Sequence, residues 1–149
     1  MINDHINTIF QVDDEFIDEL ISTQKDDRYA FPILSLLYPN LDYKNNNFHK
    51  DHLHPESAYD MLPDSTKAKY PFSVYNSILN LQMLDSNQNQ SKNDMPLVDW
   101  VDKECVALSC SKTEFLAEHL IPNVDLSLAN FEQYAEERRK LLRANLKKL

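Results

Sequence analysis

The chain of 149 residues contains no glycine, and this absence restricts its turns more than any other feature of the sequence. Glycine is the residue that adopts positive φ most readily, so every tight turn must be made with Asn, Asp, Ser or Pro. The phosphate-binding loops of P-loop and dinucleotide-binding proteins require glycine. The sequence therefore excludes both of these nucleotide-binding classes.

Composition places the chain among ordinary globular proteins. It is 42% apolar and 26% charged, and its length suits a single domain over residues 1–149. No apolar run is long enough to span a membrane, and Met1 to His5 lack the pattern of a secretory signal. We expect a cytoplasmic protein with no membrane partner, in which Cys105 and Cys110 remain thiols.

The hydrophobic pattern predicts a mainly helical α+β protein with one small hairpin. The predicted helices span about residues 14–24, 29–38, 56–61, 64–69, 72–79, 96–104, 111–121 and 126–147. One strand begins at Phe48, and a second covers about residues 80–84. The polar residues 85–94 are expected to connect the second strand to the next helix, and 105–110 to form a short apolar connection. The expected parts are a helical N-terminal part (12–40), a core (about 45–104) and C-terminal helices (111–148).

Residues 48–57 hold three imidazoles and two carboxylates, an unusual density of ligands and bases. Neighbouring side chains on a strand face opposite ways, so Asp51 and His52 lie on opposite sides of the backbone. This geometry suits a metal ligand and a general base that flank one phosphodiester. His49 and His54 are interpreted as structural. Three later residues are expected to complete the site: Asn80, Asn89 and Lys92.

The ligand types indicate which metal such a site would take. Asp51 and Asn89 present hard oxygen ligands, which favour Mg²⁺ or Mn²⁺ over Zn²⁺. A zinc site made from Cys105, Cys110 and His119 is the weaker interpretation, because the C-x₄-C spacing is loose and no second pair exists. Core packing of the two cysteines is favoured.

Three parts of the sequence together resemble the HNH nuclease signature, also called the ββα-metal or His-Me finger. They are the D-H-x-x-P run that begins at Asp51, the Asn80-Leu81 pair and the N-x-x-K run from Asn89 to Lys92. In that motif, a strand with D-H is followed by a second strand with N and by a helix start that bears the last metal ligand. The resemblance implies a ββα-metal hairpin-helix core inside a helical frame.

From about Ile33 onward, the chain also looks similar to the C-terminal half of GmrSD-type restriction proteins. The similarity includes the run from Leu34 to Pro39, Phe48-His49 and residues 131–142. Members of that family usually carry a ParB-like nucleotide-hydrolysing domain as well. The resemblance therefore implies such a domain as a partner, at the N-terminus or as a separate chain, and an effector role in antiviral restriction.

The resemblance also assigns roles to the site residues. It implies His52 as the general base, Asn80 as an amide that pins the loop bearing His52, and Lys92 as a phosphate contact. Asp51 and Asn89 would hold Mg²⁺ or Mn²⁺. The implied function is metal-dependent hydrolysis of DNA phosphodiester bonds.

The charge distribution leaves two interpretations open. The net charge is −9, yet basic residues gather near the C-terminus: Arg138, Arg139, Lys140, Arg143, Lys147 and Lys148. They are expected on the outer face of the last helix, where they either contact DNA phosphates or form a solvated helix end. The alternative function is a non-catalytic helical module that binds DNA or a partner domain.

Overall fold

The structure is a computed structural model, and it describes residues 13–149. Val12, where the N-terminal part was expected to begin, and the Met1 to His5 segment lie outside the described residues. Among residues 13–149, no helix has both the length and the apolar character that crossing a membrane requires.

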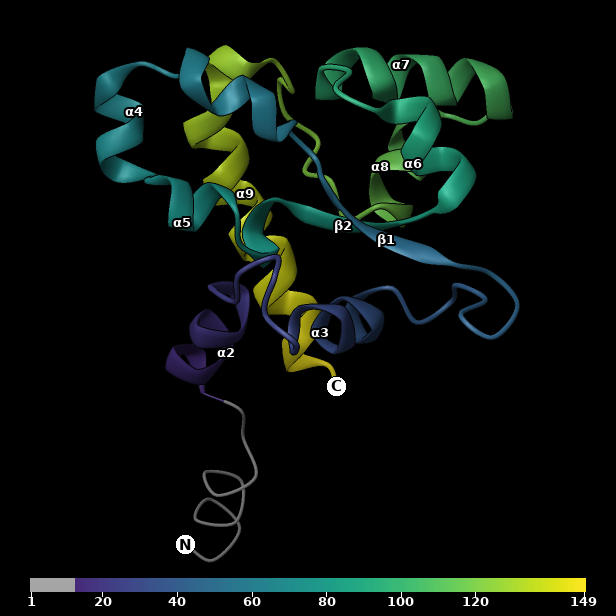
Figure 1. The fold of residues 1–149 in the computed structure, drawn as a ribbon, viewed down its shortest axis with the longest axis horizontal. Coiled ribbons are helices and arrows are strands. Elements are labelled where there is room, and N and C mark those ends of the chain that lie inside the picture. The colour runs from purple at the N-terminus through teal and green to yellow at the C-terminus, as the bar shows by residue number, and fades with distance from the viewer. Residues whose placement is uncertain (1–12) are drawn as a thin grey trace, which may run out of the picture.

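Helices make up most of the fold, and two short strands form its sheet (Figure 1). The α-helices are α2 (Asp14–Ile21), α3 (Ala30–Leu37), α4 (Asp64–Lys69), α5 (Phe72–Tyr75), α6 (Ser86–Lys92), α7 (Leu97–Leu108), α8 (Lys112–Glu118) and α9 (Phe131–Lys147). The strands are β1 (Phe48–His52) and β2 (Leu81–Asp85), and the 3-10 helices are η1 (Glu56–Met61), η2 (Ile78–Asn80) and η3 (Leu128–Asn130). The predicted mainly helical α+β class is confirmed.

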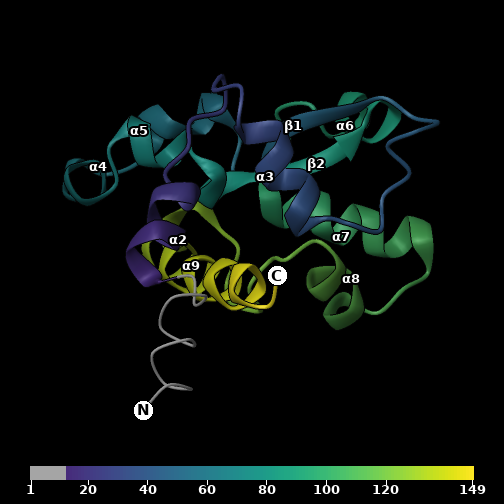
Figure 2. The same ribbon diagram turned by 90° about the horizontal axis from the view of Figure 1, so that it is seen from below.

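The two strands form an antiparallel hairpin that crosses the middle of the molecule. Asp51 lies opposite Gln82, and His52 lies opposite Leu81. α4 and α5 lie to one side of the hairpin, and α6, α7 and α8 lie to the other (Figures 1 and 2). The strand predicted to begin at Phe48 is confirmed, and β2 begins at Leu81, one residue after the expected start.

The polar residues 85–94 differ from the expectation, because most of them form helix α6 rather than a connection. The cause is local. The carboxylate of Asp85 accepts a hydrogen bond from the backbone N–H of Gln88 at 2.8 Å, and the Gln88 side chain accepts one from the Asp85 N–H at 3.5 Å. This capping box starts the helix directly at the end of β2. Asn89 therefore lies in the middle of α6, not at its start.

Residues with positive φ take the places where other proteins use glycine. Among the described residues they are Asn93 (φ 45°), Ser109 (φ 51°) and Leu120 (φ 55°). Asn93 ends α6, and Ser109 ends α7 by donating its N–H to the last carbonyls of that helix. α7 thus runs on to Leu108, and the expected connection from Cys105 to Cys110 is wrong in its first part.

Helix α9 is the element that joins the separate parts of the fold. It contacts α2, α3 and η2, and it lies beside α2 in both views (Figures 1 and 2). Its buried residues are Phe131, Tyr134, Ala135, Arg138, Leu142 and Leu146. Leu128 and Leu141 are half-buried. One cluster of buried apolar side chains includes residues of α2, α3, β2, α7, α8 and α9.

Candidate active site

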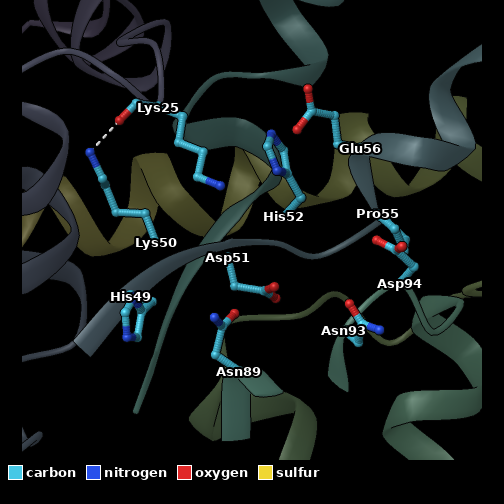
Figure 3. Close-up of a pocket in the computed structure, with 10 residues that line it drawn as sticks. All are labelled: Lys25, His49, Lys50, Asp51, His52, Pro55, Glu56, Asn89, Asn93 and Asp94. Atoms are coloured by element: carbon cyan, nitrogen blue, oxygen red, sulfur yellow. Dashed lines mark hydrogen bonds between the residues drawn. The ribbon is translucent and has the colours of Figure 1, made fainter. Parts of the chain in front are cut away.

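A pocket of about 370 Å³ lies along β1 and gathers three of the five predicted site residues: Asp51, His52 and Asn89 (Figure 3). The remaining lining residues are Lys25, His49, Lys50, Pro55, Glu56, Asn93 and Asp94. His49 and Asp51 lie on one face of β1, and Lys50 and His52 lie on the other. The pocket therefore wraps around an exposed strand edge, with a carboxylate on one side and an imidazole on the other.

Asp51 is held in a fixed orientation by two donors that contact the same oxygen. Gln82, directly opposite on β2, donates its Nε2–H to Oδ2 at 3.1 Å. The ammonium of Lys92 lies 3.1 Å from the same Oδ2. Oδ1 receives no hydrogen bond from any described residue. The carboxylate is thus oriented through one oxygen and keeps the other for a ligand, as outer contacts do for metal-binding carboxylates.

Asn89 reaches the pocket from α6, which packs against the Asp51 face of the hairpin. Its side chain points from the helix toward Asp51 (Figure 3). Within residues 13–149, its amide forms no side-chain hydrogen bond. Asp51 and Asn89 therefore present two oxygen ligands to the same space.

His52 lies against the opposite wall of the pocket and is 5% exposed. Its Nε2 is hydrogen-bonded to Oδ1 of Asn76 at 2.8 Å, and its ring stacks on Tyr75 with 6.3 Å between centroids. Burial lowers the pKa of His52 below its ordinary value, and the hydrogen bond to Asn76 partly offsets this effect. The ring is therefore neutral near pH 7, which is the form that accepts a proton.

Asn80 lies outside the pocket and is fully buried. Its Oδ1 accepts hydrogen bonds from the His54 N–H at 3.1 Å and from the Tyr134 hydroxyl at 3.0 Å, and its Nδ2 donates to the His54 carbonyl at 3.0 Å. These contacts fix the loop that follows His52. Asn80 therefore supports the site through the backbone, and it does not touch the pocket.

Lys92 is not placed to bind a phosphate, and the predicted contact is corrected here. Its side chain has no exposed surface, and its ammonium donates to the His52 carbonyl at 2.8 Å in addition to its contact with Asp51. Burial lowers the pKa of Lys92, and the Asp51 carboxylate opposes that effect. Lys92 instead joins α6 to the end of β1 beneath the site.

Lys25 and Lys50, which were not predicted as site residues, line the pocket. Lys50 lies on β1 beside Asp51, and its ammonium donates to the backbone carbonyl of Lys25. The ammonium of Lys25 lies close to His52 (Figure 3). Lys50 could have been found from its position next to the D-H pair. Lys25 could not, because it is far away in the sequence.

Within the C-terminal basic cluster, Arg138 departs from the expected position on the outer face of α9. Arg138 is fully buried, and its guanidinium donates to the carbonyls of Leu79 and Leu81 and to the Tyr38 hydroxyl, each at 3.0 Å. Most other members of the cluster pair with acids: Arg143 and Arg139 with Asp18, Lys140 with Glu137 and Lys147 with Asp14. Three of these pairs connect α9 to α2, and the pair of Lys140 with Glu137 lies within α9.

His49, His54 and His119 serve the structure around the site. His54 is buried against the Tyr134 ring at 4.5 Å, and burial lowers its pKa to about 3. His119 is bonded through Nδ1 to Oε1 of Gln82 at 3.2 Å, and burial lowers its pKa to about 4. His119 thus supports the same glutamine that orients Asp51. His49 contacts Ser86 at 3.1 Å and ties β1 to α6.

The donor set of the pocket fits a hard divalent cation with few protein ligands. Among residues 13–149, no three His, Cys, Asp or Glu side chains come close enough to hold one metal ion. Asp51 and Asn89 would supply two oxygens. Mg²⁺ usually keeps several waters and takes further oxygens from a phosphate, so two protein ligands suffice.

No protein-family model matches this chain, and no curated protein matches its sequence.

Proposed function

We propose that this protein is a metal-dependent endonuclease of the HNH type, which hydrolyses phosphodiester bonds in DNA. The observation that carries the proposal is the hairpin followed by α6, which brings Asp51 and His52 of β1 and Asn89 of α6 to one pocket. The order of strand, strand and helix is the order that the HNH signature requires.

The residues of the pocket divide the work of hydrolysis among them. His52 takes the proton of the attacking water through Nδ1, since Nε2 is engaged by Asn76. Asp51 and Asn89 would hold Mg²⁺ or Mn²⁺, and the bound ion would supply positive charge that neutralises the negative charge developing in the transition state. Lys25 and Lys50 contribute positive charge beside the scissile phosphate.

The resemblance to GmrSD-type restriction proteins extends this proposal to a biological setting. On that basis, the protein acts in the cytoplasm as the effector module of a phage-restriction system, with a ParB-like nucleotide-hydrolysing domain as its partner. The similarity of residues from Ile33 onward supports this setting, and it rests on sequence patterns.

A second candidate is a non-catalytic helical module that binds DNA or a partner domain. One observation favours it: the ammonium of Lys92 lies 3.1 Å from Asp51 and offsets the charge of the proposed metal ligand. A cation would then bind more weakly at this site than at an unpaired carboxylate.

Plasmid cleavage by the intact chain separates the two candidates. Supercoiled plasmid is incubated with the protein and Mg²⁺ or Mn²⁺, with EDTA as the metal-free control. If nicked or linear plasmid forms only when the metal is present, the result supports the nuclease proposal. Stable DNA binding without any metal-dependent product favours the binding module.

The two pocket lysines predict how DNA affinity depends on salt. In a His52→Ala background, which keeps the DNA intact, Lys25→Gln with Lys50→Gln should weaken binding and reduce the slope of log affinity against log salt by about two units. Fluorescence anisotropy of a labelled duplex over a salt series measures both quantities. Arg139→Gln with Lys140→Gln is the matched control on α9 and should change neither. If the α9 variant weakens DNA binding and the pocket variant does not, the DNA interface lies on the C-terminal helix.

A further inference from the structure

We infer that Gln24 and Asn76 are positioning residues that set the tautomer of His52, so that Nδ1 is the bare nitrogen of its neutral ring. The inference rests on the proposed function, because it gives His52 the role of general base. It adds two residues that the HNH motif does not contain. Gln24 comes from the N-terminal helical part, outside the expected core of residues 45–104.

His52, Asn76 and Gln24 form a relay of side-chain hydrogen bonds. His52 Nε2 lies 2.8 Å from Oδ1 of Asn76. Asn76 donates its Nδ2–H to Oε1 of Gln24 at 3.3 Å. Gln24 donates its own Nε2–H to the backbone carbonyls of Ser22 at 3.2 Å and Ser73 at 2.5 Å.

The direction of each bond follows from the last one. A backbone carbonyl accepts hydrogen bonds and never donates, so the Gln24 group that faces Ser22 and Ser73 must be its amide nitrogen. Oε1 of Gln24 then faces Asn76, and it requires a donor there. The Asn76 amide must turn its NH₂ to Gln24 and its oxygen to His52. That oxygen accepts, so Nε2 of His52 carries the hydrogen and Nδ1 is left bare.

The backbone holds the start of this relay in place. Gln24 forms an isolated β-bridge with Ser77. The Lys25 N–H donates to the Asn76 carbonyl at 2.9 Å, and the Ile78 N–H donates to the Thr23 carbonyl at 3.0 Å. The segment between α2 and α3 is therefore paired with the residues that carry Asn76. A fixed backbone on both sides lets a side-chain relay impose one tautomer.

Ring ¹⁵N NMR of the full chain tests the relay without reference to cleavage. Spectra tuned to the couplings within the imidazole report which nitrogen carries the hydrogen, and His52→Ala assigns the signal. The intact chain should show the Nε2–H form. Asn76→Leu removes the acceptor, and Gln24→Leu frees the Asn76 amide to turn, so both variants should lose the single tautomer. Asn76→Asp keeps an acceptor and should retain it.

Cleavage kinetics are the second test of the relay. Asn76→Leu and Gln24→Leu should lower kcat by about 10- to 100-fold with little change in KM, because the base is misplaced while the DNA contacts remain. Asn76→Asp should recover part of the loss. Gln90→Leu, at an exposed position on α6, is the matched control and should match the intact chain. Backbone amide spectra show whether each variant is folded.

The outcomes separate this inference from the proposed function. Suppose that the intact chain shows a single Nε2–H tautomer, that folded Asn76→Leu and Gln24→Leu both lose it, and that the chain does not cleave DNA. The inference about the relay is then supported, and the proposed nuclease function is wrong. A cleaving chain whose His52 carries its hydrogen on Nδ1, or keeps the Nε2–H form in both leucine variants, overturns the relay and leaves the nuclease in place.

Discussion

His52→Ala is expected to reduce metal-dependent plasmid cleavage by roughly 10²–10⁴-fold, the usual contribution of a positioned general base. The substitution removes the imidazole but leaves Asp51 and Asn89 in the pocket. Metal and DNA should therefore still bind. Initial rates of nicking measured with Mg²⁺, together with DNA binding by anisotropy, separate the lost chemistry from lost affinity.

Asp51→Ala is the matched comparison, because it removes a metal ligand from the other side of the same strand. Some of its lost activity should return as Mn²⁺ is raised, since Asn89 and water still supply oxygens. Added metal cannot replace an imidazole, so His52→Ala should not respond. If both variants keep full cleavage in a preparation free of contaminating nuclease, the HNH proposal is wrong and the binding-module candidate replaces it.

Arg138→Met should cost about 2–4 kcal/mol of unfolding free energy, the largest stability effect that we expect from a single substitution here. The change leaves the Leu79 and Leu81 carbonyls and the Tyr38 hydroxyl without their buried donor. The avoided burial of a charged group offsets part of this cost. Urea unfolding followed by circular dichroism measures the loss.

Arg139→Met is the control for that substitution, since Arg139 is its neighbour on α9 and is partly exposed. It should change the free energy of unfolding by no more than about 0.5 kcal/mol. Equal losses for the two variants would show that the buried guanidinium does not stabilise the hairpin.

Local patterns in the sequence were enough to predict the frame of the site. The start of β1 at Phe48 and the start of the helix predicted near residue 111 depend on neighbours within a few residues, and both are present in the structure. Helix α6 was not predicted, although its signal is local too. The capping box of Asp85 and Gln88 lies within a run of polar residues that resembles a loop.

Contacts between distant residues account for the remaining errors. Lys92 ends beside Asp51 because α6 folds back on the hairpin, and its burial cannot be inferred from its spacing to Asn89. Arg138 has the sequence surroundings of a solvated helix, yet it points to the Leu79 and Leu81 carbonyls. Lys25 reaches the pocket from a loop between two helices. None of these positions follows from a periodic pattern.

The position of α9 in the chain has a consequence for the order in which the protein assembles. The ribosome delivers β1, β2 and α6 before α9, yet α9 supplies Arg138 and Tyr134, which hold the residues around Asn80. The nascent hairpin therefore lacks its buried donors until α9 has left the exit tunnel. The pocket around Asp51 and His52 therefore takes its final form only after α9 has been synthesised and has packed against the residues around Asn80.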